Sequence, residues 1–235
     1  MALSAEEWLA VWERGRTRHP LDRALLLFSL ASPELPTDAL ADQPVGRLNA
    51  SLLAFRRAEF GHVLAAYLDC PACSERLEFE LDVAALSDTD WRGEREVEVD
   101  GWRFRVPTLR DLAAIADDAD AATAAQRLFL ACGEAMAIAP PSSQPARPDM
   151  LRVEAALEAA DPGADIMLAV QCDACGHAWQ APFDIAGLLW EEIETRAERL
   201  LDDVDRLARA YGWSEAQILA LSDTRRGAYL DRVSL

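Results

Sequence analysis

The stretch that decides this fold is CPACSERLEFELDVAAL at residues 70–86, and it recurs in altered form as CDACGHAWQAPFDIAGL at residues 172–188. The two copies lie 102 residues apart and share both cysteines, the alanine between them, and an aspartate, an alanine and a leucine further on. Each copy supplies one Cys-x-x-Cys pair, and the two pairs together predict a split metal site. The predicted ligands are Cys70, Cys73, Cys172 and Cys175. Four thiolates form a closed tetrahedral shell, which suits a structural Zn²⁺ ion and leaves no open position for a substrate.

The residues after each pair favour a metal over redox chemistry. In a thioredoxin-type Cys-x-x-Cys motif, a helix begins at the pair and lowers the pKa of the first thiol. Residues 77–81 instead alternate apolar and acidic side chains, which predicts a strand, as in a zinc ribbon. The alternatives are unligated thiols, a disulfide pairing, a thiol oxidoreductase, and His177 in place of one thiolate.

The rest of the chain predicts a mainly α, α+β protein that carries the small β zinc ribbon and a β-hairpin. The pairs lie further apart than in a single zinc ribbon, so we expect an inserted segment that leaves and returns to one small sheet. The predicted divisions are a helical region at 1–69, the first ribbon half at 70–90, an inserted hairpin and helices at 91–164, the second ribbon half at 165–187 and a helical tail at 188–235.

Helix signals surround the predicted site. Ser4 with Glu7 forms a capping box, and Thr108 with Asp111 forms a second helix start. Apolar spacing predicts a helix at 24–30 and helical structure at 46–67, with a breaker at Gly61, that delivers the first cysteine pair. Further expected elements are alanine-rich helices to about residue 139, a linker at 140–145, a helix at 151–160 and a strand at 166–170.

A β-hairpin is predicted around Asp100 and Gly101, which supply the positive-φ pair of a two-residue turn. This turn places Val99 opposite Trp102 and, two residues further out, Val97 opposite residue 104 on one apolar face. Glutamates then meet arginines across the other face.

Charge and composition exclude several function classes. The 235 residues hold 41 acidic and 23 basic side chains, a net charge of −18, and every basic residue is arginine. Without lysine, Schiff-base and P-loop chemistry are excluded. So acidic a chain repels nucleic acid phosphates. No secretion signal or membrane span is expected, and the cysteine usage indicates the cytoplasm. Cys132 is expected to be a buried hydrophobic residue. The sequence contains no recognised catalytic motif, so we do not expect an enzyme.

The acidic helical surface and the carboxy-terminal residues are together predicted to form a docking surface. Apolar residues recur at three and four positions from residue 189 to 211, which predicts a long amphipathic helix that Gly212 ends. Ser214 and then Asp223 or Thr224 begin two shorter helices. The residues expected to dock a partner are Tyr211, Trp213, Arg225, Arg226 and Tyr229.

In the order of its parts, the chain resembles the baseplate hub assembly chaperones of T-even-type contractile phage tails and their relatives in extracellular contractile injection systems. The resemblance rests on the two cysteine pairs, the carboxy-terminal segment, and the segments PVGR at 44–47, VPTLRDL at 106–112 and WQAPFD at 179–184. It departs at residues 49–51, where more charged residues are expected, and at Ser74, where a glycine is expected after the pair.

The resemblance implies a non-enzymatic assembly factor or component of a baseplate, with hub or spike proteins as partners. The cysteine usage predicts a cytoplasmic protein, which as a baseplate factor would associate with the particle. The net charge predicts no nucleic acid partner, and the absence of a long apolar stretch predicts no membrane partner. The alternative function is a zinc-ribbon adaptor in transcription or nucleic acid metabolism.

Overall fold

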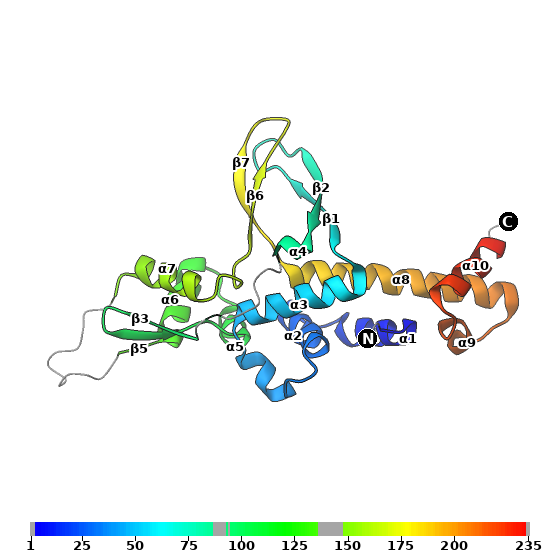
Figure 1. The fold of residues 1–235 in the computed structure, drawn as a ribbon, viewed down its shortest axis with the longest axis horizontal. Coiled ribbons are helices and arrows are strands. Elements are labelled where there is room, and N and C mark those ends of the chain that lie inside the picture. The colour runs from blue at the N-terminus through cyan, green and yellow to red at the C-terminus, as the bar shows by residue number, and fades with distance from the viewer. Residues whose placement is uncertain (1–2, 87–92, 94, 136–147, 234–235) are drawn as a thin grey trace. The chain divides into compact units, whose positions relative to one another are not determined.

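The computed structural model describes residues 3–86, 93, 95–135 and 148–233 (Figure 1). Helices make up 58% and short antiparallel strands 17% of the structure, which confirms the predicted mainly α, α+β class. The chain forms two compact units, one of Met1–Leu26 with Ala186–Leu235 and one of Leu27–Ile185. The linker predicted at 140–145 lies outside the described residues.

The first unit is built from helices at the two ends of the sequence. Its elements are α1 (Ala5–Gly15), the start of α2 (Pro20–Ala31), α8 (Ile185–Tyr211), α9 (Glu215–Leu219) and α10 (Asp223–Val233). The predicted capping box begins α1, since Glu7 accepts from the Ser4 N–H at 2.7 Å. Trp8 is fully buried, and Arg196 of α8 stacks over its ring at 5.1 Å. Gly212, at φ 69°, follows the end of α8 as predicted.

The second unit contains all the described strands. Its elements begin with the end of α2 and continue with η1 (Thr37–Asp42), α3 (Val45–Phe60), β1 (Val63–Asp69), β2 (Arg76–Asp82), α4 (Val83–Leu86), β3 (Glu96–Val99), β4 (Trp102–Arg105), α5 (Leu109–Ile115), α6 (Ala121–Cys132), β5 (Gly133–Ala135), α7 (Met150–Ala160), β6 (Met167–Gln171) and β7 (Ala178–Pro182). The strands form three antiparallel sheets, β1-β2, β3-β4-β5 and β6-β7.

The β3-β4 hairpin has the predicted register. Val99 lies opposite Trp102 and Val97 opposite Phe104, and the turn residues Asp100 and Gly101 have φ of 52° and 81°. On its apolar face, Phe104 is fully buried in a cluster with Val99 and Val153 of α7. The hairpin therefore forms a small core of its own together with α7.

Two predicted helix ends were wrong. Helical structure does not continue to residue 67, because α3 ends at Phe60, Gly61 turns the chain at φ 89°, and β1 delivers the first cysteine pair. The alanine-rich helix before residue 139 ends at Cys132, where Gly133 begins β5. A Cβ on Gly133 would lie 2.4 Å from the Phe104 ring, so glycine lets β5 lie against that ring.

A carboxylate remote in sequence caps the first turn of α3. Pro44 precedes α3 and has no capping side chain. Instead the buried Asp161 accepts a hydrogen bond from the Gly46 N–H at 3.0 Å. Asn49 donates to the carbonyl of Gly163 at 2.8 Å. These contacts tie the first turns of α3 to residues 161–164, which lead into β6.

Candidate metal centre

Each cysteine pair lies at the turn of a β-hairpin. In the first hairpin, the Cys70 N–H donates to the carbonyl of Glu75 at 2.9 Å, and the Ser74 N–H donates to the carbonyl of Cys70 at 2.8 Å. The second hairpin repeats both bonds 102 residues later, from Cys172 to His177 and from residue 176 to Cys172, each at 2.8 Å. The repeat seen in the sequence is thus a repeat of backbone conformation.

The position after each pair requires a left-handed backbone. Gly176 adopts φ 75°, which costs glycine little. Ser74 adopts nearly the same conformation, at φ 61°, although it carries a Cβ. The departure from glycine at the first turn therefore leaves the geometry of the turn unchanged, at the cost of local backbone strain.

The turns of the two hairpins lie side by side (Figure 1), and the four cysteine sulfurs come together there. Cys70 Sγ lies 3.7 Å from Cys175 Sγ, and Cys73 Sγ lies 3.7 Å from Cys172 Sγ. All four sulfurs lie within 4.8 Å of one another. A tetrahedral zinc ion with Zn–S bonds of about 2.3 Å requires sulfurs about 3.8 Å apart. The sulfur cluster is therefore of the right size to hold one metal ion.

The cluster is not a pair of disulfides, since the described cysteines are all free thiols and the closest sulfurs between hairpins are 3.7 Å apart. Cys70 and Cys172 are buried, whereas Cys73 and Cys175 are exposed. One cysteine of each pair thus faces the protein and the other faces solvent.

The thiols of the cluster differ widely in acidity. Burial raises the pKa of Cys70, but hydrogen bonds from the backbone N–H groups of Ala72 and Cys73, and from neighbouring thiols, outweigh it and lower that pKa to about 7. The N–H of Glu75 lowers the pKa of Cys73, yet the Cys175 thiol, burial and the other thiols raise it to about 12. The thiols therefore oppose one another's ionisation, and a bound metal cation would favour the thiolate form of all four.

The expectation that both hairpins belong to one small sheet was wrong. β1-β2 and β6-β7 are separate two-stranded sheets. The strand predicted after the first pair is β2, and the one predicted before the second pair is β6. The sulfur cluster, and not a shared ladder of hydrogen bonds, is where the turns of the two hairpins meet.

The two other candidate residues lie outside the cluster. His177 is not among the clustered ligands and stacks on Trp179, with ring centroids 5.7 Å apart. Cys132 is buried at the end of α6, where burial raises the pKa of its thiol to about 11. Cys132 is therefore the buried hydrophobe that the sequence predicted.

The predicted docking residues divide into two groups. Tyr211, Trp213 and Tyr229 form one aromatic cluster, with ring centroids 4.7 to 5.6 Å apart. Arg225 is exposed. Arg226, however, is buried and donates to Asp203 at 3.0 Å and to Asp223 at 2.7 Å. Arg226 thus holds α10 against α8, and its assignment to a docking surface was wrong.

Among protein-family models, curated proteins and solved structures, nothing matches this chain. The resemblance to baseplate hub chaperones therefore stays a prediction. Of the helices in the described parts of the chain, none offers an apolar stretch long enough to span a bilayer, and even the 27-residue α8 is interrupted by charged side chains.

Proposed function

We propose that this protein is a non-enzymatic assembly factor or component of the baseplate hub of a phage-tail-like contractile machine, with one structural zinc ion held by the four cysteines. The observation that carries the metal assignment is the convergence of four sulfurs from hairpins far apart in the sequence. Four protein ligands complete a tetrahedral zinc shell, so such an ion has a structural and not a catalytic role.

Zinc explains how two small sheets hold together. An isolated two-stranded hairpin is marginally stable in water. Structural zinc contributes about 10–16 kcal/mol of binding free energy in zinc-finger peptides, against a net stability of about 5–15 kcal/mol for a typical domain. The ion would therefore provide most of the free energy that keeps the two hairpin turns together.

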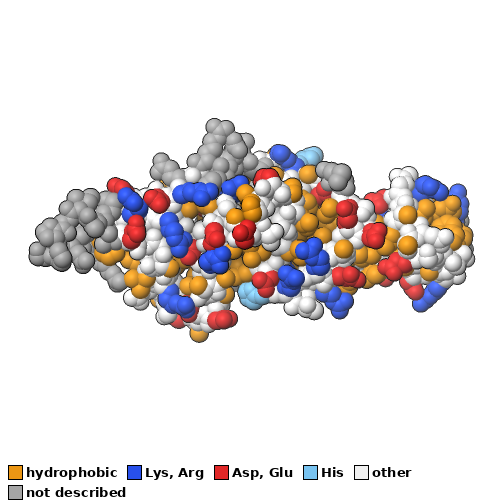
Figure 2. Space-filling view, turned by 90° about the horizontal axis from the view of Figure 1, so that it is seen from below, with side chains coloured by type: hydrophobic (Ala, Val, Ile, Leu, Met, Phe, Trp, Pro, Cys, Tyr) orange, Lys and Arg blue, Asp and Glu red, His pale blue; other side chains and the backbone are white. Residues whose placement is uncertain are grey.

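The assembly role is supported by the surface of the carboxy-terminal helices. Tyr211 is 38% exposed and stacks on Trp213 and Tyr229 beside the exposed Arg225. Figure 2 shows hydrophobic side chains gathered over α9 and α10, with arginines around them. Aromatic residues and arginine are enriched at the centres of protein interfaces. The net charge of −18 disfavours a nucleic acid partner.

The metal is tested by measuring zinc in purified protein by mass spectrometry. We expect about one zinc ion per chain in the natural protein, and a loss of zinc in Cys73→Ser and in Cys175→Ser. Both cysteines are exposed, so these changes leave the packing of the core intact. Cys132→Ser is the matched control and should retain zinc. Full zinc content in both cluster variants would refute the assignment.

The assembly role is tested by co-purification with hub and spike proteins encoded beside the gene. Removal of residues 212–233 should abolish particle assembly while zinc binding persists, because the cysteines lie in the other compact unit. Normal assembly after this deletion would rule out the proposed docking surface. Salt-dependent binding to DNA or RNA would instead favour the adaptor alternative.

A further inference from the structure

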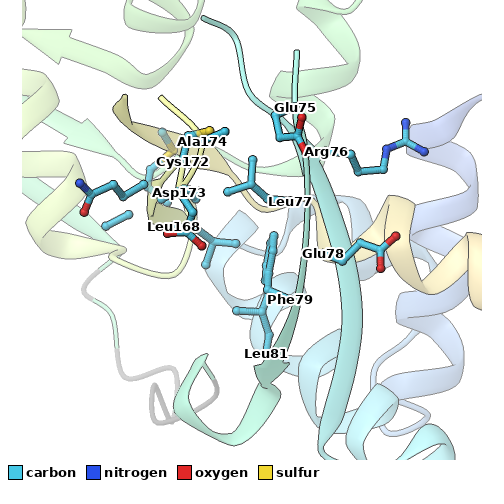
Figure 3. Close-up of a pocket in the computed structure, with 14 residues that line it drawn as sticks. Glu75, Arg76, Leu77, Glu78, Phe79, Leu81, Leu168, Cys172, Asp173 and Ala174 are labelled. Atoms are coloured by element: carbon cyan, nitrogen blue, oxygen red, sulfur yellow. The ribbon is translucent and has the colours of Figure 1, made fainter. Parts of the chain in front are cut away.

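A groove of about 780 Å³ lies between the two cysteine-bearing hairpins. It is lined by residues 75–79 and Leu81 on one side and by residues 167–174 on the other. Figure 3 shows Leu77, Phe79 and Leu81 pointing from β2 into this space, towards Leu168. The groove therefore runs along β2 and β6 and ends at the second cysteine pair.

The main chain of both strands contributes to the lining of the groove. Successive side chains of a strand point to opposite faces, yet consecutive residues of β2 and of β6 contribute to the lining. Figure 3 shows Arg76 and Glu78 pointing away from the space, so these residues contribute their main chain. Within the described residues, β2 pairs only with β1 and β6 only with β7. Each strand thus has a second edge without a strand partner.

The side chains in the groove suit an extended peptide. Leu77 and Phe79 on β2, and Leu168 and Val170 on β6, recur every second residue and are only half-buried. Met167 at the open end is 44% exposed. A peptide in strand conformation presents apolar side chains at the same two-residue spacing and can bond to both free edges, which is the chemistry of strand addition.

The acidic residues of the two hairpins indicate the charge of the segment that would bind in the groove. Residues 63–82 and 167–182 carry six carboxylates and a single arginine. That arginine, Arg76, is already held by Asp69 through bonds of 2.9 and 3.1 Å. In the described structure, no ion pair neutralises Glu75 or Asp173, which line the cysteine end of the groove. A complementary segment therefore carries basic residues beside its apolar ones.

We propose that this groove binds an extended segment of a partner protein, in which apolar residues alternate with arginine, lysine or threonine. The segment runs between β2 and β6, bonds to their free edges and places its apolar side chains against Leu77, Phe79 and Leu168. This inference deepens the assembly role proposed above and rests on it, since an assembly factor needs a segment of its partner to hold.

The test uses the full-length, zinc-loaded protein and a fluorescent synthetic peptide of about nine residues, enough to span a strand such as β2 at ~3.4 Å per residue. The peptide alternates valine with arginine or threonine. Fluorescence anisotropy should show micromolar binding that weakens with added salt. An analogue with N-methylated amides on one edge should bind at least about tenfold more weakly, because it cannot donate to the strand edge. An analogue with glutamate in place of arginine should not bind.

Two neighbouring residues of β6 provide a matched pair of variants. Leu168→Gln places a polar group in the groove and should weaken binding at least about tenfold, whereas Ala169→Gln, on the opposite face, should change it less than about twofold. Zinc content and circular dichroism of both variants verify that the hairpins are intact. The proposal is overturned if the zinc-loaded protein does not bind the peptide, if N-methylation of the peptide leaves its affinity unchanged, or if the Leu168 and Ala169 variants bind it with the same affinity.

These results separate the groove from the proposed function. A folded protein that binds the peptide with this pattern but contains no zinc would refute the zinc assignment and still support peptide binding in the groove. A zinc-loaded protein that binds its hub partner but does not bind the peptide would refute only the proposal of peptide binding in the groove.

Discussion

Replacing Gly46 with alanine should destabilise the protein, although alanine is the better helix former. The substitution gains about 1 kcal/mol of helix propensity. However, the new Cβ would lie 1.8 Å from Asp161 Oδ1 and 2.7 Å from its Cγ, so the carboxylate has to move away. The hydrogen bond of 3.0 Å from the Gly46 N–H is then lost.

The expected loss follows from what the displaced carboxylate leaves behind. A buried backbone N–H without a partner costs about 1–3 kcal/mol, and removing a carboxylate from a helix amino terminus costs about 0.3–1 kcal/mol more. After subtraction of the gain in propensity, Gly46→Ala should lower the free energy of unfolding by about 0.3–3 kcal/mol. Asp161→Ala should lower it by about 1 kcal/mol more, because it removes the same bond without the gain in helix propensity.

A double-mutant cycle isolates this contact. In Gly46→Ala/Asp161→Ala the methyl group no longer meets the carboxylate, so the double variant should be more stable than Asp161→Ala alone by about 1 kcal/mol of helix propensity. It should also be more stable than the sum of the single losses by at least about 1 kcal/mol. Urea unfolding in zinc-saturated buffer, followed by circular dichroism, measures all four proteins.

The control is Gly227→Ala in α10, where a Cβ would meet nothing within 4 Å. This change should leave stability unaltered or raise it by up to about 1 kcal/mol. Additive losses in the cycle, or a Gly46→Ala protein as stable as the natural one, would refute the remote cap.

Three further predictions concern single side chains. Phe104→Ala should cost about 3–5 kcal/mol in urea unfolding, because the ring is fully buried; a loss below about 1 kcal/mol would contradict the small core. Burial raises the pKa of Asp111, but hydrogen bonds, first from Arg105, outweigh it and lower that pKa to about 2. The pKa of Asp111 is lower in the folded protein than in the unfolded chain, so the carboxylate stabilises the fold above about pH 4. The natural protein should there be about 1–2 kcal/mol more stable than Asp111→Asn, and this difference should disappear as the pH falls through about 2. A difference that stays constant with pH would exclude this ion pair. Arg226→Ala should cost about 2–3 kcal/mol, since it leaves Asp203 without this partner, whereas equal effects of Arg226→Ala and the exposed Arg225→Ala would show that the buried network is unimportant.

Local patterns predicted the elements whose geometry is set by neighbouring residues. The register of β3-β4 followed from Asp100-Gly101, because a two-residue turn fixes the opposing pairs. The capping boxes at Ser4 and Thr108 followed from side chains that bond three residues away. The boundaries of α7 and β6 were also predicted to within one residue.

The predictions that were wrong concern segments whose structure depends on tertiary contacts. β1 has an apolar spacing that also fits a helix, and only Gly61 and the pairing with β2 make it a strand. β5 depends on the space that Gly133 leaves above Phe104. The burial of Arg226 depends on Asp203, which lies in another helix. No local pattern contains these partners, so none of the three features could be predicted from residues close in sequence.

By itself, the sequence determined which sulfurs form the cluster, because a doubled Cys-x-x-Cys motif is a local and repeated pattern. It also determined the overall charge and the long amphipathic helix. Only the tertiary structure decided that the pairs meet at the turns of two separate sheets, that Asp161 caps α3, and that a groove remains between β2 and β6. The reason is physical: hydrogen bonds within a turn involve residues close in sequence, whereas the meeting of two hairpins depends on packing between segments about a hundred residues apart.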